Sequence, residues 1–187
     1  MSAQRPAPAY LSGYPPSVGA VMADPQGRQA VLQRLRAQHA CTHAVRTDAA
    51  LRAYADALRV RFMRRAPPLS QVRFDNRLQW VHNALGTHAS VSRVQGQRLV
   101  NKREIRVAGI FRTMPDRLLR MIVVHELAHL KEREHDRAFY ALCEHMEPQY
   151  HQLELDLRLA LTLVELTGEP VWPDGAGGAT AGITSPL

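Results

Sequence analysis

The sequence predicts an α+β fold in which a small antiparallel sheet packs on helices, one of them carrying a metal site. Apolar residues first recur at helical spacing, up to about residue 66. Short alternating segments with β-branched residues follow between residues 71 and 110. Helical spacing then returns, and its first helix contains the string HELAH. This succession of helices, strands and helices is typical of an α+β domain.

The two ends of the chain differ in composition from the rest. Residues 1–20 and residues 168–187 are rich in Pro, Gly, Ala and Ser, a composition that favours loose segments. We therefore expect a flexible N-terminal segment at 1–20 and a disordered C-terminal tail at 168–187. A single domain at 21–167 remains between them.

Two helices are expected in the first third of the chain. Gly27–Gln38 has apolar residues at helical spacing and predicts a short helix. Thr47 is a good N-cap for a longer one, which Pro67 would end. The apolar face of the longer helix consists of Leu51, Tyr54, Leu58 and Phe62.

The middle of the chain predicts three to five antiparallel strands. Its segments are short and alternating, with Gly or Asn between them. They are Gln71–Phe74, Leu78–His82, Ala89–Val94, Arg98–Val100 and Glu104–Ile110.

Three helices are expected in the last third of the chain. Thr113 and Asp116 suit a capping box at the start of the first, and Asp136 suits the N-cap of the second. Leu153–Leu163 has Leu at every other position, as a strand would, but Leu at four-residue spacing also satisfies a helix. Because Leu favours helices, we predict a helix there.

The most informative motif is His125-Glu126-x-x-His129, which lies within an apolar run. On a helix the two histidines are one turn apart on the same face, so their ring nitrogens can meet at one zinc ion. Glu126 points to an adjacent face, where it can act as general base on a water activated by the metal. Two core histidines beside an ordinary glutamate would be the non-catalytic alternative.

His135 is the expected third ligand. On a continuous helix it would lie about 15 Å along the axis from His125, too far to share a metal. The helix must therefore end near Lys131–Glu134 for the chain to turn back. The five-residue gap resembles the metzincin pattern HExxHxxGxxH, but Glu132 stands at its Gly, so we expect a different turn. His145 and His151 are the spare candidates, ranked below His135.

Composition restricts the compartment and the partners. The formal net charge is +7 and the pI is 10.1, which favours polyanions such as nucleotides or nucleic acid. The arginines are spread along helices, so a set of solvated helix faces is the favoured interpretation of them. Neither a membrane span nor a secretory signal is expected. The two cysteines, Cys41 and Cys143, form no CxxC pair, and the chain is expected to be cytoplasmic.

Several strings closely resemble the YgjP-like metal-dependent hydrolases, a family grouped with minimal zinc metallopeptidases. They are RMIVVHELAHLKEREHDRAFY, CEHMEPQYHQLELDLRL, ALGTHASVSRVQGQRL and KREIRVA. The resemblance implies a zincin-like fold and one zinc ion held by His125, His129 and His135, with Glu126 as catalytic base. It extends to SprT-like and WLM-type proteases, which act on proteins crosslinked to DNA. Many of those relatives have a W-G-S-C string where this chain has Leu85-Gly86-Thr87-His88.

Substrate contacts are expected from the segment before the metal helix. In zincin-like folds an edge strand beside the metal pairs with an extended peptide, and Ala89–Val94 is the candidate strand. Arg93 and His88 would then lie near the metal, and His88 could donate a hydrogen bond to a developing oxyanion. A histidine on the surface or on the face of the sheet is an equally good interpretation of His88.

Three functions compete at this stage. The motif favours peptide-bond hydrolysis by a zinc enzyme. The resemblance also implies a nucleoside triphosphate (UTP) pyrophosphatase, although the chain contains no GxxxxGK[ST] loop. A metal-stabilised nucleic-acid-binding module is the non-enzymatic alternative, but structural zinc sites usually have four protein ligands rich in Cys. Three histidines would also accept Mn, Co or Ni.

Overall fold

A computed structural model describes residues 9–76 and 104–173 of the chain. Within them the α+β fold is confirmed, with six α-helices and a two-stranded sheet. In chain order the elements are α1 (Pro16–Ala23), α2 (Pro25–Gln38), α3 (Asp48–Phe62), β1 (Gln71–Asp75), β2 (Glu104–Ala108), α4 (Asp116–Ala128), α5 (Arg137–Met146) and α6 (Tyr150–Thr167). Two 3-10 turns, η1 (Ala9–Leu11) and η3 (Gly109–Arg112), complete the description.

The strand pairing differs from the prediction. β1 and β2 are parallel, with Gln71 opposite Glu104 and Asp75 opposite Ala108, whereas we expected an antiparallel sheet. Antiparallel neighbours need only a tight turn, but parallel ones need a crossover of about a dozen residues or more. Residues 76–103 are long enough for one. The three strands expected at 78–82, 89–94 and 98–100 lie outside the described residues.

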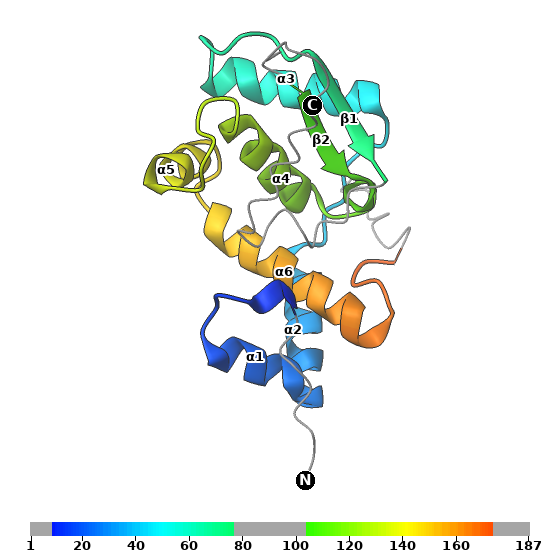
Figure 1. Ribbon diagram of the computed structural model, residues 1–187. Coiled ribbons are helices and arrows are strands. Elements are labelled where there is room, and N and C mark those ends of the chain that lie inside the picture. The colour runs from blue at the N-terminus through cyan, green and yellow to red at the C-terminus, as the bar shows by residue number, and fades with distance from the viewer. Residues whose placement is uncertain (1–8, 77–103, 174–187) are drawn as a thin grey trace, which may run out of the picture.

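The main core fixes the position of α4. In Figure 1, α3 and the strand pair lie on one side of α4, and α6 passes on the other side. Eight residues of α4 are buried because its sequence is apolar almost all round. Phe111, Phe139 and Tyr150, from three different segments, close this core around the helix. A helix enclosed in this way holds the residues of its last turn in fixed positions.

A second core joins the N-terminal helices to the end of α6. Leu11, Met22 and Leu35 pack there against Leu159 and Leu163. Residues 9–20 were expected to be loose, yet η1 and most of α1 lie in this segment and bury Leu11. Parts of both terminal segments are therefore ordered, since Val171 is also buried in this core.

The helix ends test the capping predictions. Thr47 and Asp136 accept hydrogen bonds from the backbone N–H groups of Ala50 and Phe139, as expected of N-caps. The predicted capping box at Thr113 is wrong, because its hydroxyl donates to the carbonyl of Ile110 and Pro115 precedes α4 without a side-chain cap. The helix predicted at Leu153–Leu163 is confirmed as part of α6.

Asp156 is a buried carboxylate that ties α2 to α6. It accepts hydrogen bonds from His39 Nε2 at 2.9 Å and from Gln152 at 2.9 Å, and it pairs with Arg34 at 3.0 Å. Burial alone would raise the pKa of this carboxyl, but the hydrogen bonds from His39, Gln152 and Arg34 outweigh burial and lower it. The contact therefore stabilises the fold in the ionised form of Asp156.

We predict that Asp156→Asn lowers the free energy of unfolding by about 2–3 kcal/mol at pH 6, since hydrogen bonds to a charged group are lost. Because the pKa of Asp156 is lower in the folded state, its ionised carboxyl stabilises the fold at pH values above the ordinary Asp pKa of about 3.9. This stabilisation is lost as the pH falls through the pKa of Asp156 in the folded protein. Urea unfolding should show the difference from wild type shrinking below pH 4. Asp56→Asn is the control, because Asp56 is partly exposed and forms a surface ion pair with Arg59. This substitution should lower the free energy of unfolding by about 1 kcal/mol or less. Equal losses in the two variants at pH 6 would contradict this assignment.

Candidate metal centre

The motif lies at the C-terminal end of α4. His125 and Glu126 belong to its last turn, and His129 is the C-cap residue. The α-helix ends at Ala128, slightly before the end predicted near Lys131–Glu134, and a turn continues to Lys131. Because the buried face of α4 fixes this end, His125 and His129 project together from one place on the core.

The turn after α4 brings His135 back to the same place. The backbone N–H groups of Lys131 and Glu132 both donate to the carbonyl of Ala128, so a tightened turn follows the end of the helix. No described residue other than glycine has a positive φ, so Glu132 avoids the left-handed conformation of the metzincin glycine, as expected. Asp136 then caps α5. A hydrogen-bonded turn before His135 and the capped start of α5 after it therefore hold His135 in its position.

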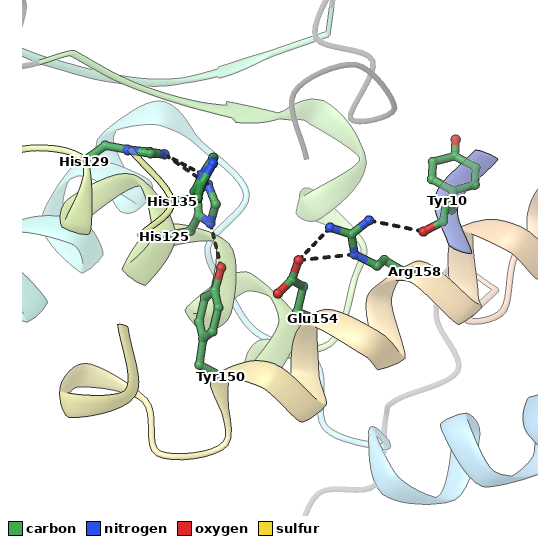
Figure 2. A network of polar contacts seen from close by, with 7 residues as sticks. All are labelled: Tyr10, His125, His129, His135, Tyr150, Glu154 and Arg158. Atoms are coloured by element: carbon green, nitrogen blue, oxygen red, sulfur yellow. Dashed lines mark hydrogen bonds and ion pairs between the residues drawn. The ribbon is translucent and has the colours of Figure 1, made fainter. Parts of the chain in front are cut away.

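The three histidines converge on one point. Their Nε2 atoms are 3.2 Å apart between His125 and His129, 3.1 Å between His129 and His135, and 3.2 Å between His125 and His135. Figure 2 shows the rings meeting at these nitrogens. Ligand nitrogens about 2.0–2.1 Å from a tetrahedral zinc lie about 3.3 Å from one another. Among the described residues, this is the one group of three or more potential ligands that could hold a metal ion.

The outer ring nitrogens decide where the protons lie. His129 Nδ1 is 3.0 Å from the carbonyl oxygen of Glu132, which can only accept, so Nδ1 carries the hydrogen and Nε2 keeps its lone pair. His125 Nδ1 is 2.6 Å from the Tyr150 hydroxyl. Burial lowers the pKa of His129 and lowers that of His125 further, where the neighbouring histidines add to the effect. Neutral rings with inward lone pairs are what a metal requires.

Phe139 provides the apolar wall of the centre. Its ring centroid lies 4.9, 4.6 and 4.7 Å from those of His125, His129 and His135. One buried aromatic residue at the start of α5 therefore packs against all three imidazoles. It restricts how far any of them can rotate away from the common point.

Glu126 is the acidic residue of the centre. Burial raises the pKa of its carboxyl to about 7. The residue is half-buried, and within the described ranges its side chain makes no hydrogen bond or ion pair. A carboxyl group whose pKa lies near 7, in the residue next to His125, can exchange a proton with water at physiological pH.

Other sequence candidates lie elsewhere. His145 packs edge-on against Phe62 at 5.7 Å, and His151 pairs with Glu144 at 3.3 Å on the surface. Arg93 and His88 fall between residues 77 and 103, outside the described residues. Sequence reasoning missed Tyr150 and Phe139 as neighbours of the centre, because an apolar stripe shows that a residue is buried and does not show what it contacts.

The chain is similar to known proteins over most of its length. The family described as YgjP-like, metallopeptidase domain, matches residues 102–160, which contain all three histidines and Glu126. The UTP pyrophosphatase of Escherichia coli (strain K12) is 52% identical over 157 residues, covering 84% of this chain and 94% of the relative. The chain belongs to the YgjP-like family. The family resemblance expected from the sequence is confirmed, and with it the class of metal-dependent hydrolase.

No solved structure matches the chain. Within the described part of the chain, no helix is both long and apolar enough to cross a bilayer.

The two thiols of this YgjP-like protein differ in surroundings, and we predict that they differ in reactivity. Burial raises the pKa of the Cys143 thiol to about 12, whereas Cys41 is exposed. Because the thiolate is the reactive form, the native protein should show one fast thiol with a disulfide reagent at pH 8. Cys41→Ser should remove that fast phase and leave Cys143 reactive only after denaturation. Fast labelling of native Cys41→Ser would contradict the buried position of Cys143.

Proposed function

We propose that this protein hydrolyses nucleoside triphosphates, with UTP as the substrate, at a centre where His125, His129 and His135 hold one divalent metal ion. In this proposal Glu126 is the general base. The observation that supports it most directly is the convergence of three Nε2 atoms at 3.1–3.2 Å. The choice of substrate rests on the 52% identical relative named UTP pyrophosphatase.

The chain's own residues have separate tasks in this scheme. A divalent ion at the three nitrogens would supply an activated water and neutralise negative charge on the substrate. Glu126 takes a proton from the attacking water, a task that suits a carboxyl whose pKa burial raises to about 7. Phe139 excludes solvent from one side of the imidazoles. The proposed contacts with the phosphates are Arg93 and His88, which precede β2 in the chain.

The charge of the protein supports a polyanionic substrate. A net charge of +7 attracts a triphosphate, and arginine binds phosphate oxygens bidentately. Zinc is the proposed ion because three imidazole nitrogens at near-tetrahedral spacing suit it. Mn, Co and Ni remain alternatives, since three histidines also bind them.

Peptide-bond hydrolysis is the second candidate. It is favoured by the HExxH motif and by the family's description as a metallopeptidase domain. The same Glu126 would serve as base, so the centre alone supports both reactions. A non-enzymatic nucleic-acid module is the weaker alternative, because the described residues bring together three ligands and a purely structural zinc site usually has four.

Two further proposals concern the whole chain. We keep 21–167 as the proposed domain, to which the segments 1–20 and 168–187 contribute Leu11 and Val171 in the second core. The cytoplasm is the proposed compartment, supported by two cysteines that form no disulfide with each other.

We predict that His135→Ala lowers the affinity for zinc by more than about 100-fold. Loss of a residue that only supports a metal ligand lowers metal affinity by about 10–100-fold. In His135→Ala one of the three proposed ligands is itself removed. Competition with a chromophoric chelator measures the dissociation constant. His145→Ala, at an exposed histidine of the neighbouring helix, is the matched control and should bind zinc as wild type does. Wild-type zinc affinity in His135→Ala would show that His135 is not a ligand. A loss of zinc affinity in His145→Ala would likewise contradict the proposed ligand set.

Glu126→Gln should keep its zinc and lose turnover by about 10²–10⁴-fold, the usual contribution of a general base. Pyrophosphate release from UTP by the zinc-loaded protein is the measurement, with a casein or peptide-library digest run in parallel. Pyrophosphate release by the wild type but not by Glu126→Gln supports the nucleotide hydrolase. Peptide cleavage without pyrophosphate release would replace it with the second candidate, and full activity in Glu126→Gln would reject the proposed base.

A further inference from the structure

A buried tyrosine of α6 lies against the outer face of His125. The Tyr150 hydroxyl is 2.6 Å from His125 Nδ1, and Tyr150 is only 1% exposed. Figure 2 shows the hydroxyl approaching the ring from the side opposite the other two histidines. The two rings are nearly parallel, with centroids 6.3 Å apart and an interplanar angle of 17°. The contact joins the first turn of α6 to the last turn of α4.

The direction of this hydrogen bond follows from the inner nitrogens. His125 Nε2 lies 3.2 Å from the Nε2 atoms of both His129 and His135. A hydrogen on Nε2 would point into that group and block a metal, so the hydrogen of the neutral ring belongs on Nδ1. The Nδ1–H therefore donates to the Tyr150 oxygen. His129 has the equivalent arrangement, in which the Glu132 carbonyl is the acceptor.

The tyrosine is itself held in place by the main core. Tyr150 belongs to that core together with Phe139 and Cys143 of α5. Tyr150 is 1% exposed and Cys143 is fully buried. The packed ring therefore keeps its hydroxyl beside His125.

We propose that Tyr150 is a positioning residue that holds His125 in the Nδ1–H form, with the Nε2 lone pair directed at the metal. Acceptors on the outer nitrogen of a ligand histidine fix its tautomer and ring orientation in the same way in other metal sites. This inference rests on the proposed function of the three histidines. It adds a role for a residue that touches neither metal nor substrate.

The first test is the zinc affinity of Tyr150→Phe. This variant keeps the ring and removes only the acceptor, and its zinc dissociation constant should rise by about 10–100-fold. Tyr140→Phe is the matched control. Its ring also stacks near a proposed ligand, 6.4 Å from His135, but no hydrogen bond to a histidine involves its hydroxyl among the described residues, so its affinity should equal that of wild type. An affinity of Tyr150→Phe within about twofold of wild type would overturn the inference.

Thermal unfolding of the metal-free proteins separates positioning from folding. Tyr150→Phe should retain a cooperative transition and show a smaller zinc-induced rise in melting temperature than wild type. If wild type itself bound no zinc, the proposed function would fail. If wild type bound zinc and Tyr150→Phe bound it equally well, only the role of Tyr150 would fail.

A measurement on the wild type keeps the inference testable even if Tyr150→Phe does not fold. Long-range proton–nitrogen NMR of the zinc-loaded protein reports which ring nitrogen of each histidine carries hydrogen. His125 should show a protonated Nδ1 with slow hydrogen exchange, because the hydrogen is buried against Tyr150. A His125 whose Nδ1 lacks the hydrogen would overturn the inference.

Discussion

Three imidazole lone pairs that point at one another repel, and a cation between them converts this repulsion into attraction. The Nε2 atoms of His125, His129 and His135 lie 3.1–3.2 Å apart, and each ring can supply at most one hydrogen in its neutral form. His129 has already placed its hydrogen on the outer nitrogen, against the Glu132 carbonyl. The surrounding structure is arranged so that this convergence persists. A buried α4, the turn that follows Ala128 and a capped α5 hold the three rings in place.

Helix α6 connects the centre to the rest of the molecule. Tyr150, Glu154 and Arg158 follow one another at four-residue spacing, so they form one stripe along the helix. Tyr150 contacts His125, and further along the stripe Arg158 pairs with Glu154 at 2.6 Å and donates to the Tyr10 carbonyl at 3.2 Å (Figure 2). The C-terminal half of the same helix buries Leu159 and Leu163 against the N-terminal helices. The two cores therefore share one helix whose first turn reaches the metal centre.

The sequence predicted the convergence of the three histidines better than it predicted the sheet. His125 and His129 are local, because their four-residue spacing on a helix places them together whatever the rest of the fold does. His135 required one further step, since the motif made sense only if the helix ended. The direction of strand pairing depends on the path of the chain between β1 and β2, which no local pattern encodes, and the expected antiparallel sheet was wrong for that reason. The contact of Tyr150 with His125 could not be predicted either, because the two residues are 25 positions apart along the chain.

The chemistry of the metal itself is the most direct test of this account. Zinc K-edge X-ray absorption of the protein loaded with one equivalent of zinc reports the type and distance of the bound atoms. The account predicts three imidazole nitrogens at about 2.0–2.1 Å, with multiple scattering from the rings and one additional oxygen. A zinc–sulfur contribution near about 2.3 Å, or a signal without imidazole scattering, would contradict it.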